Sequence, residues 1–330
     1  MAEKPIIIAT RGSALALAQA NLVADACRAE FPQLRCELKI IKTTGDKMQT
    51  ASLANPGGTL PKGLFTKELE MALLAGEADL AVHSLKDLPT ELPDGLILAA
   101  TLKREDARDV LVRRPSNFFT DPASRLTKIP GFDSHPTLKD FPHGATFATS
   151  STRRKMSLLA VRPDLHIVEI RGNVATRLQK IAEHGEWDAT VLALAGMARL
   201  GFKIDSDGSL SGEGVPTGLM ATILSLDEML PCVGQGAIGI ETRADDERIG
   251  KILAQINHAD TFEAVAAERS FLRGMGGGCQ SPVGAHAEIS GGTVWLRAVS
   301  FQDKLVKRAE GRRPVNEATA LGLQIAAQLK

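Results

Sequence analysis

The sequence lacks several features that would assign it directly to a common functional class. Its 330 residues include no tyrosine, and aromatic residues make up only 4% of the chain, which leaves few rings on which nucleic-acid bases could stack. The 39 basic and 39 acidic residues cancel, so no overall positive field attracts nucleic acid. We therefore expect no nucleic-acid partner, and an anionic ligand would need a local cluster of cations.

Long apolar runs and paired cysteines are missing as well. No run approaches the roughly eighteen apolar residues of a transmembrane helix, and the apolar stretch Ile6–Ile8 is too short for the core of a signal peptide. The four cysteines, at positions 27, 36, 232 and 279, form no C-x-x-C pair, and no phosphate-binding glycine motif or H-E-x-x-H motif occurs. These absences predict a reduced, cytoplasmic protein with no membrane partner and no bound metal.

Alternating strand and helix patterns occupy most of the chain. Ile6–Thr10 and Asp79–Ser84 are typical of strands, and Ala14–Glu30 is typical of a helix. The proline-rich residues 114–144 interrupt this alternation and predict a long surface excursion rather than a core element. The alternation then resumes over residues 146–194. Two such blocks predict two α/β domains with mostly parallel sheets.

The last part of the chain has a different pattern. Two predicted helices, residues 246–257 and 261–273, precede three strand-like runs and a final helix over 315–329, which indicates a small α+β domain. Cys279 follows three glycines, Gly276–Gly278, on the loop before that sheet. Such a segment is not helical and leaves the sulfur unshielded, so this thiol is a candidate attachment point or nucleophile.

Cationic and hydroxyl side chains recur where predicted strands end. Ligands of open α/β sheets bind outside the carboxyl ends of the strands, and arginine engages both oxygens of a carboxylate. One such arginine is usually solvated, and one such serine is usually a helix cap. Repetition at equivalent places nevertheless predicts a cleft for a multiply anionic ligand. The candidate residues are Arg11, Ser13, Lys86, Thr149, Ser150, Ser151, Arg153, Arg154, Arg171, Asn173, Arg177 and Arg199.

Asp87 is the strongest candidate for chemistry. It follows the predicted strand Asp79–Ser84 and precedes Leu88-Pro89, which forces a turn. A carboxylate there, close to cations, can stabilise a developing positive charge or transfer a proton, effects typically worth about 10²–10⁴-fold in rate. On local grounds it could equally be a turn-capping aspartate paired with Lys86. We interpret His83 as a packed strand histidine rather than a base.

Eight motifs, in order along nearly the whole chain, closely resemble those of the porphobilinogen deaminase (hydroxymethylbilane synthase) family. Any one of them alone would be weak, but eight collinear motifs leave little room for coincidence. They are T-R-x-S (10–13), K-G-L-F-x-K-E-L-E (62–70), A-V-H-S-x-K-D (81–87), E-D-x-R-D (105–109), T-S-S-x-R-R (149–154), R-G-N-V-x-T-R (171–177), V-G-Q-G (233–236) and G-G-C-Q (277–280).

The resemblance implies a transferase of tetrapyrrole biosynthesis. Such an enzyme joins four porphobilinogen molecules head to tail, releases ammonia and gives hydroxymethylbilane, starting from a covalently bound dipyrromethane cofactor. By motif position, Cys279 would hold this cofactor as a thioether, and Asp87 would be the catalytic aspartate that stabilises the cationic azafulvene. The candidate residues above, with Lys62 and Gln235 added, would bind the carboxylates of cofactor and substrate. Lys62 lies in a loop longer than is usual in the family.

The resemblance also implies a particular domain organisation. Two domains resemble periplasmic binding proteins, the second inserted into the first, and a small α+β domain follows. The expected boundaries are 1–103 with 233–254 for the first domain, 104–232 for the second and 255–330 for the third, in a monomer. Periodicity alone does not indicate this insertion.

Two rival hypotheses come from other functional classes. A periplasmic-type polycarboxylate-binding protein without catalysis would explain the arginines but not Asp87 or Cys279. A cysteine-nucleophile transferase or hydrolase would need a histidine near Cys279. His258 and His286 are available in the sequence, although no motif joins them to the thiol.

Overall fold

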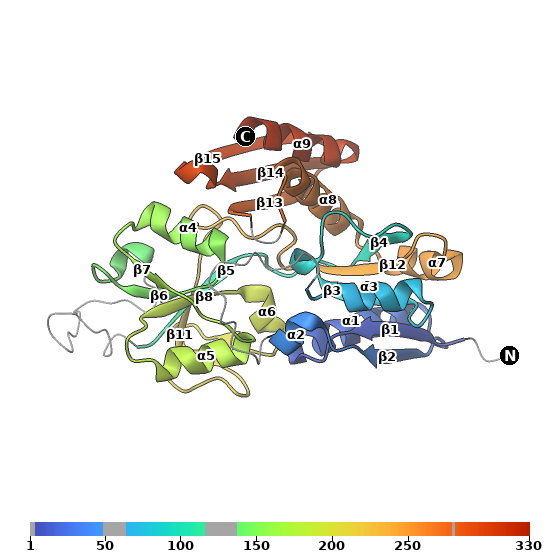
Figure 1. The fold of residues 1–330 in the computed structure, drawn as a ribbon, viewed down its shortest axis with the longest axis horizontal. Helices are drawn as coiled ribbons and strands as arrows, with labels where there is room; N and C mark the ends of the chain where they lie inside the picture. The colour runs from blue at the N-terminus through green and yellow to red at the C-terminus, as the bar shows by residue number, and fades with distance from the viewer. Residues whose placement is uncertain (1–3, 49–63, 116–136, 279–280) are drawn as a thin grey trace.

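The computed structural model describes residues 4–48, 64–115, 137–278 and 281–330. Within these residues the strands form two five-stranded sheets, one three-stranded sheet and a two-stranded ribbon. Figure 1 shows the two larger sheets side by side, with the three-stranded sheet and its helices above them. The predicted α/β class is confirmed. Mostly parallel sheets were predicted, whereas both large sheets are mixed, each with two parallel and two antiparallel strand pairings.

The first sheet combines strands from two distant parts of the chain. Its order is β2 (Cys36–Ile40), β1 (Ile6–Thr10), β3 (Leu80–Ser84), β12 (Ile238–Arg243) and β4 (Leu96–Thr101). β1 pairs in parallel with β2 and β3, whereas β12 is antiparallel to both β3 and β4. The chain therefore leaves this sheet after β4 and returns to its interior with β12.

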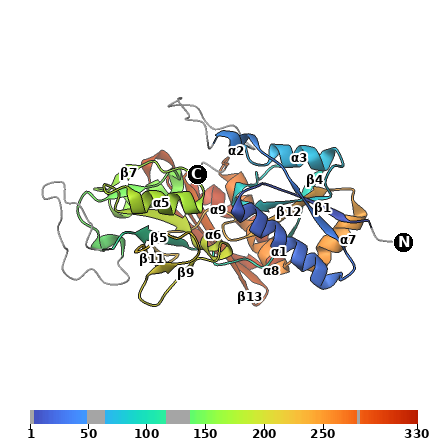
Figure 2. The ribbon, with the colours of Figure 1, turned by 90° about the horizontal axis from the view of Figure 1, so that it is seen from below.

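Helices cover both faces of the first sheet (Figure 2). α1 (Ala14–Glu30) and α7 (Glu247–Ile256) pack on one face, and α3 (Lys67–Leu74) packs on the other. The bounds of α1 agree with the prediction because its apolar residues recur at helical spacing and the Ser13 hydroxyl accepts a hydrogen bond from Ala16 N at its start. The short α2 (Thr44–Met48) precedes α3.

The second sheet has the order β11 (Met220–Ile223), β5 (Asp109–Arg113), β8 (Ala189–Ala193), β6 (Thr146–Ala148) and β7 (His166–Val168). β8, β6 and β7 are parallel, and β5 is antiparallel to β8 and β11. Three helices follow strands of this sheet, and a short ribbon lies nearby. They are α4 (Thr152–Val161), α5 (Val174–Glu183), α6 (Leu194–Arg199), β9 (Lys203–Ile204) and β10 (Leu210–Ser211).

The predicted surface excursion over residues 114–144 is wrong for its final part. Leu138 and Phe141 are buried in the core of the second sheet, and the Phe141 ring packs edge-on against Phe147 with centroids 4.9 Å apart. The Arg162 guanidinium donates hydrogen bonds to three carbonyls of residues 138–142. The prolines of this segment indicated a surface loop, so the burial of these two residues was not predicted. Residues 116–136 lie outside the described part of the chain.

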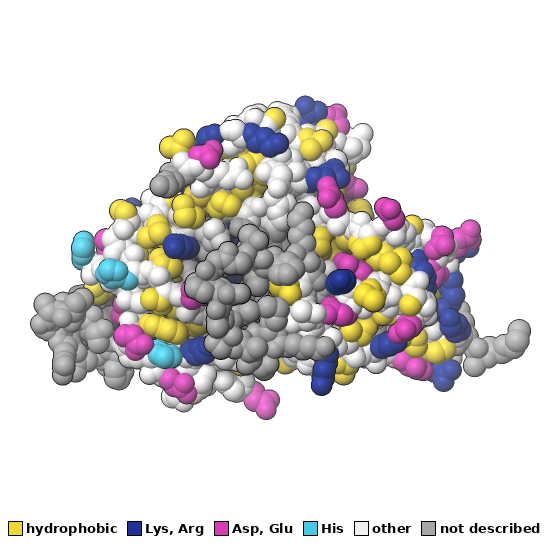
Figure 3. Space-filling model, viewed as in Figure 1, with side chains coloured by type: hydrophobic (Ala, Val, Ile, Leu, Met, Phe, Trp, Pro, Cys, Tyr) yellow, Lys and Arg dark blue, Asp and Glu magenta, His cyan; other side chains and the backbone are white. Residues whose placement is uncertain are grey.

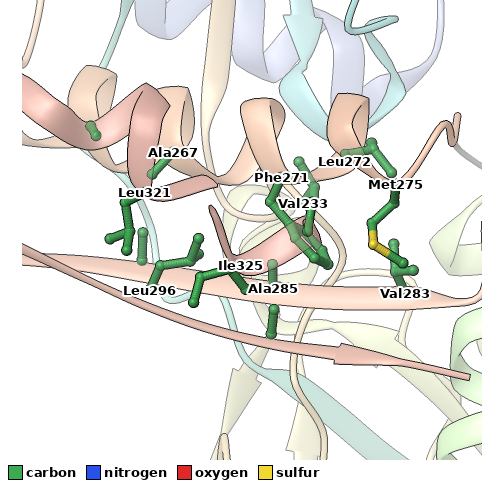
Figure 4. Close-up of a cluster of buried hydrophobic side chains, with 14 of the residues drawn as sticks. Val233, Ala267, Phe271, Leu272, Met275, Val283, Ala285, Leu296, Leu321 and Ile325 are labelled. Atoms are coloured by element: carbon green, nitrogen blue, oxygen red, sulfur yellow. The ribbon is translucent and has the colours of Figure 1, made fainter. Parts of the chain in front are cut away.

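The C-terminal part forms the predicted α+β layer. β13 (Val283–Ser290), β14 (Thr293–Ser300) and β15 (Lys307–Pro314) form an antiparallel sheet, and α8 (Ala259–Gly274) and α9 (Ala318–Leu329) pack on it. Figure 4 shows the apolar cluster between these helices and strands. No helix among the described residues is long and apolar enough to span a membrane.

One buried carboxylate, Glu268 on α8, joins these layers. It accepts two hydrogen bonds from the Arg104 guanidinium, at 2.6 and 3.1 Å, and one each from the amides of Gly234 and Ala287, at 2.7 and 2.8 Å. Arg104 lies just after β4, where the chain leaves the first sheet, and Gly234 lies where it returns. Glu268 therefore connects α8 to the segment that leaves the first sheet, to the segment that returns to it, and to β13 of the third sheet.

Replacing Glu268 with alanine is expected to destabilise the fold by about 3–5 kcal/mol, because the Arg104 charge and two buried amides would lose their acceptor. Denaturant unfolding measures this loss. Glu310→Gln, at an exposed position of β15, is the matched control and should change the unfolding free energy by no more than about 0.5 kcal/mol. Equal stability of the two variants would contradict the role of Glu268.

Candidate active site

Asp87 lies on a single 3₁₀ turn, Leu85–Asp87, directly after β3. Leu85 and Leu88 are buried on either side of it, while the Asp87 side chain is exposed and lines a pocket. This pocket measures about 440 Å³, part of it open to solvent. The polar and charged side chains that line it are Arg11, Ser13, Gln19, Thr66, His83, Ser84 and Asp87. The turn thus presents the carboxylate to a pocket that is open to solvent.

The first predicted cation, Arg11, lies in this pocket. Its guanidinium forms an ion pair with Asp46 of α2 and stacks on the Phe65 ring, 4.2 Å from the centroid. Burial alone would raise the pKa of the Asp46 carboxyl, but hydrogen bonds from Arg11 and Thr43 outweigh it and lower that pKa. Asp46 therefore holds the Arg11 guanidinium at the pocket wall.

A second group of cations surrounds Asp109, the first residue of β5. The buried Asp109 carboxylate forms ion pairs with Arg153 Nη1 at 2.8 Å and Arg154 Nη2 at 2.7 Å, and Gln235 Nε2 donates to it at 3.0 Å. Burial opposes ionisation, but the two guanidinium charges hold the pKa of Asp109 far below its ordinary value. This carboxylate gathers three of the predicted site residues.

Lys86 and Arg177 connect this group to Asp87. Lys86 Nζ lies 3.5 Å from Gln235 Oε1. Burial lowers the pKa of the Lys86 ammonium, an effect that Asp87 opposes and Arg154 increases. Burial and Arg154 likewise lower the pKa of the Arg177 guanidinium to about 10, against the attraction of Asp87. Lys86 shares the turn with Asp87, and the Gln235 side chain beside it donates to Asp109, so the two groups of charges are adjacent.

The charges in this site favour a further anion. Around Asp87 and Asp109 the described residues place four cations, Lys86, Arg153, Arg154 and Arg177, against two carboxylates. The buried Nε atoms of Arg153 and Arg199 have no hydrogen-bond partner among the described residues. An excess of buried and half-buried cations over carboxylates suits a ligand that carries several carboxylates, which would supply the missing negative charge.

The face of the molecule seen in Figure 3 is not generally basic. On the face seen in Figure 3, basic and acidic side chains are interspersed over the lobe that contains β1 to β4. This agrees with the zero net charge of the chain. Attraction of an anion must therefore come from the side chains of the site itself.

Several predicted ligand residues already act as helix caps. The Ser151 hydroxyl accepts from Arg154 N at the start of α4, and Thr149 Oγ1 accepts from Ser151 N at 3.2 Å. Asn173 Oδ1 accepts from Thr176 N at 2.8 Å at the start of α5. These caps fix the two helix N-termini, whose positive ends favour an anion nearby.

Three further predicted residues, Ser150, Arg171 and Arg199, come after β6, β7 and β8 in the chain. The Ser150 hydroxyl donates to Ile170 O at 2.8 Å, which joins the ends of β6 and β7. Arg199 Nη2 donates to Gly236 O at 2.6 Å. Arg171 is exposed and lies 3.4 Å from Glu169. The structure does not bring Arg171 into contact with the residues around Asp109. Lys62 and Cys279 lie outside the described residues.

Two residues that organise the site, Asp46 and Asp109, were not among the predicted site residues. Asp109 belongs to the E-D-x-R-D motif and is the first residue of a strand whose residues are all buried. A buried carboxylate requires cationic partners, so its position could have indicated them. Asp46 carried no such signal. Cys232 was also unassigned: burial raises the pKa of its thiol, while Arg153 and Lys86 oppose this. No cluster of three metal-binding side chains occurs in the described part of the chain.

The fold and the site together define an α/β protein that carries a cluster of cations around the buried Asp109 and, close by, one exposed aspartate on a turn after β3. Residues 6–251 match the family model "porphobilinogen deaminase, dipyromethane cofactor binding domain", and residues 262–330 match "porphobilinogen deaminase, C-terminal domain". The chain belongs to the porphobilinogen deaminase family. It is accordingly a transferase of tetrapyrrole biosynthesis, which polymerises porphobilinogen and uses a dipyrromethane cofactor.

The similarity to known proteins covers nearly the whole chain. The chain is 43% identical to a porphobilinogen deaminase of Chloroherpeton thalassium, over 98% of this chain and 93% of that protein. It is also 43% identical to that of Trichlorobacter lovleyi, over 100% of this chain and 94% of that protein. Among solved structures it is similar to the periplasmic aliphatic sulphonate binding protein SsuA from Escherichia coli, with 11% identity and a TM-score of 0.39 over 82% of this chain and 70% of that one.

Proposed function

We propose that the cleft between the first two sheets binds dipyrromethane and incoming porphobilinogen through their carboxylates, with Cys279 as the attachment point and Asp87 as the catalytic residue. The observation that supports this is the surplus of partly buried cations around Asp109 and Asp87. Every pyrrole unit brings an acetate and a propionate, so the cations and the ligand charges match in kind.

The proposed set of binding residues includes all those predicted from the sequence. Arg11 and Ser13 lie directly after β1 of the first sheet. Lys86 lies on the turn after β3, and Gln235 lies just before β12, where the chain returns to the first sheet. The remaining members are Lys62, Thr149, Ser150, Ser151, Arg153, Arg154, Arg171, Asn173, Arg177 and Arg199. In this scheme Asp109 holds the guanidiniums of Arg153 and Arg154 together as a buried positive cluster, whose charge attracts the carboxylates of the ligand.

The bound dipyrromethane would supply the nucleophilic pyrrole carbon to which the first unit is joined, and each later unit would be joined to the ring added before it. The chain's own contribution centres on the Asp87 carboxylate. It accepts the pyrrole N–H hydrogen bond and stabilises the positive charge that develops on porphobilinogen as the C–N bond breaks and ammonia leaves. When the new C–C bond forms, a ring carbon loses a proton, which an Asp87 oxygen can accept and pass to solvent.

We further propose the domain division 1–103 with 233–254, 104–232 and 255–330. The return of β12 to the first sheet and the separate apolar clusters of the three sheets support it. We also propose that the protein acts as a monomer in the cytoplasm and binds no nucleic acid. Its neutral charge and lack of paired cysteines support this part.

Ammonia release tests the proposal against a binding protein without catalysis. Incubation with porphobilinogen should release four ammonia molecules for each linear tetrapyrrole formed. A polycarboxylate-binding protein would instead bind porphobilinogen without releasing ammonia. Binding without ammonia release, by a protein with its cofactor in place, would contradict the proposal.

The role of the buried cations is tested by Arg177→Met. Removing one charge-assisted donor is expected to lower kcat/KM for porphobilinogen about 10- to 100-fold, because such bonds contribute about 1.5–3 kcal/mol. Lys155→Met, which removes an exposed cation from α4, is the matched control and should remain near wild type. Steady-state kinetics at constant ionic strength measure both, and equal values would remove Arg177 from the binding site.

A further inference from the structure

The turn that carries Asp87 packs against helix α8, which belongs to the C-terminal α+β part of the chain. Leu85 and Leu88, which flank Asp87, pack with Val265 of α8 in a buried apolar cluster. This contact joins the end of β3 to a helix nearly 180 residues further along the chain. The position of the Asp87 turn therefore depends on α8 as well as on its own strand.

Arg269, one turn beyond Val265 on α8, adds a polar connection at the same place. Its Nη1 donates to Leu88 O at 3.1 Å and its Nη2 donates to Pro89 O at 2.6 Å. Both acceptors are backbone carbonyls in the two residues directly after Asp87. Because the guanidinium is planar and its two N–H groups are fixed relative to each other, a double bond of this kind restricts both position and orientation.

The same helix leads to the proposed attachment point. α8 ends at Gly274, and Cys279 follows five residues later in the sequence. We propose that Arg269 is a positioning residue that fixes the Asp87 carboxylate relative to the helix from which the tether departs. This inference rests on the proposed roles of Asp87 and Cys279. In this view Arg269 keeps the Asp87 carboxylate aligned with the reacting end of the pyrrole chain that is attached to Cys279.

The expected effect is on the chemical step rather than on binding. A displacement of about 1 Å at a reacting centre can cost roughly 10²-fold in rate. Arg269 lines a different cavity from the Asp87 pocket and is not among the residues around Asp109. Its loss should therefore lower kcat while leaving KM for porphobilinogen and cofactor content nearly unchanged.

The test compares three variants of the full-length protein, each checked for cofactor content by intact mass and for stability by thermal unfolding. Arg269→Met is expected to lower kcat about 10- to 100-fold, and Arg269→Lys, which keeps the charge but not the two-pronged geometry, should lie in between. Arg273→Met removes an exposed arginine one helical turn further on, in the same cavity, and should keep wild-type kcat. Equal kcat for the 269 and 273 variants at equal cofactor content would overturn the proposal.

A double-mutant cycle with Asp87 separates this inference from the proposed function. If Arg269 acts through Asp87, then adding Arg269→Met to Asp87→Ala should slow the enzyme no further. A fully multiplicative loss would show that Arg269 acts elsewhere and would overturn the inference alone. Normal turnover by Asp87→Ala itself would instead contradict the proposed role of Asp87.

Discussion

Replacing Asp87 with alanine is expected to lower turnover of porphobilinogen about 10²–10⁴-fold, the range typical of a lost charge-stabilising or proton-transferring group. The carboxylate is exposed, and the neighbouring Leu85 and Leu88 hold its turn in place through apolar contacts. The variant should therefore keep its fold and its thermal stability. Steady-state release of ammonia under saturating porphobilinogen measures the loss.

Two further variants define what the carboxylate contributes. Asp87→Asn keeps the shape and a hydrogen-bond acceptor but removes the charge, so it should be impaired nearly as much as alanine if charge stabilisation dominates. Asp94→Ala changes an exposed aspartate in the following loop and should keep wild-type turnover. Near-normal rates in Asp87→Ala would reduce Asp87 to a turn cap.

Replacing Asp109 with alanine is expected to lower the free energy of unfolding by about 3–5 kcal/mol. The carboxylate is fully buried and is the shared partner of Arg153 and Arg154. Its removal would leave two buried guanidiniums close together without a counter-ion. Denaturant unfolding measures the loss, and a cost below about 1 kcal/mol would contradict this role.

The same replacement should change the pH dependence of stability. The pKa of Asp109 is far below its ordinary value in the folded protein, so its stabilising contribution is present above the unfolded pKa of about 3.9. It is lost as the pH falls from there through the folded pKa. The gap in unfolding free energy between wild type and Asp109→Ala should therefore be constant near neutral pH and narrow below about pH 4. A constant gap down to pH 2 would contradict the assignment.

The regular elements were largely predictable because their signals are local. The bounds of α1 follow from its Ser13 cap and its helical apolar spacing, and β14 is one of the three strand-like runs expected in the last part of the chain. The buried residues Leu138 and Phe141 were missed because prolines on both sides suggested a loop. Whether a loop residue is buried depends on what packs over it, here the second sheet, which no local pattern describes.

The site was predictable in composition but not in pairing. Cations after strands could be read from the sequence, since the carboxyl ends of parallel strands meet at one edge. Their partners could not, because Asp109 is 45 positions from Arg154 and 126 from Gln235. The Arg269 contact with Leu88 spans 181 positions. Such contacts depend on tertiary structure, and local periodicity holds no information about them.

Intact mass spectrometry of the denatured protein tests the central claim, that Cys279 anchors a dipyrromethane cofactor. The active protein should show an added mass equal to two linked porphobilinogen-derived units, and peptide mapping should locate it on Cys279. Cys279→Ser should lack this mass and form no product, whereas Cys232→Ser should retain the mass. An active enzyme with unmodified Cys279 would contradict the account.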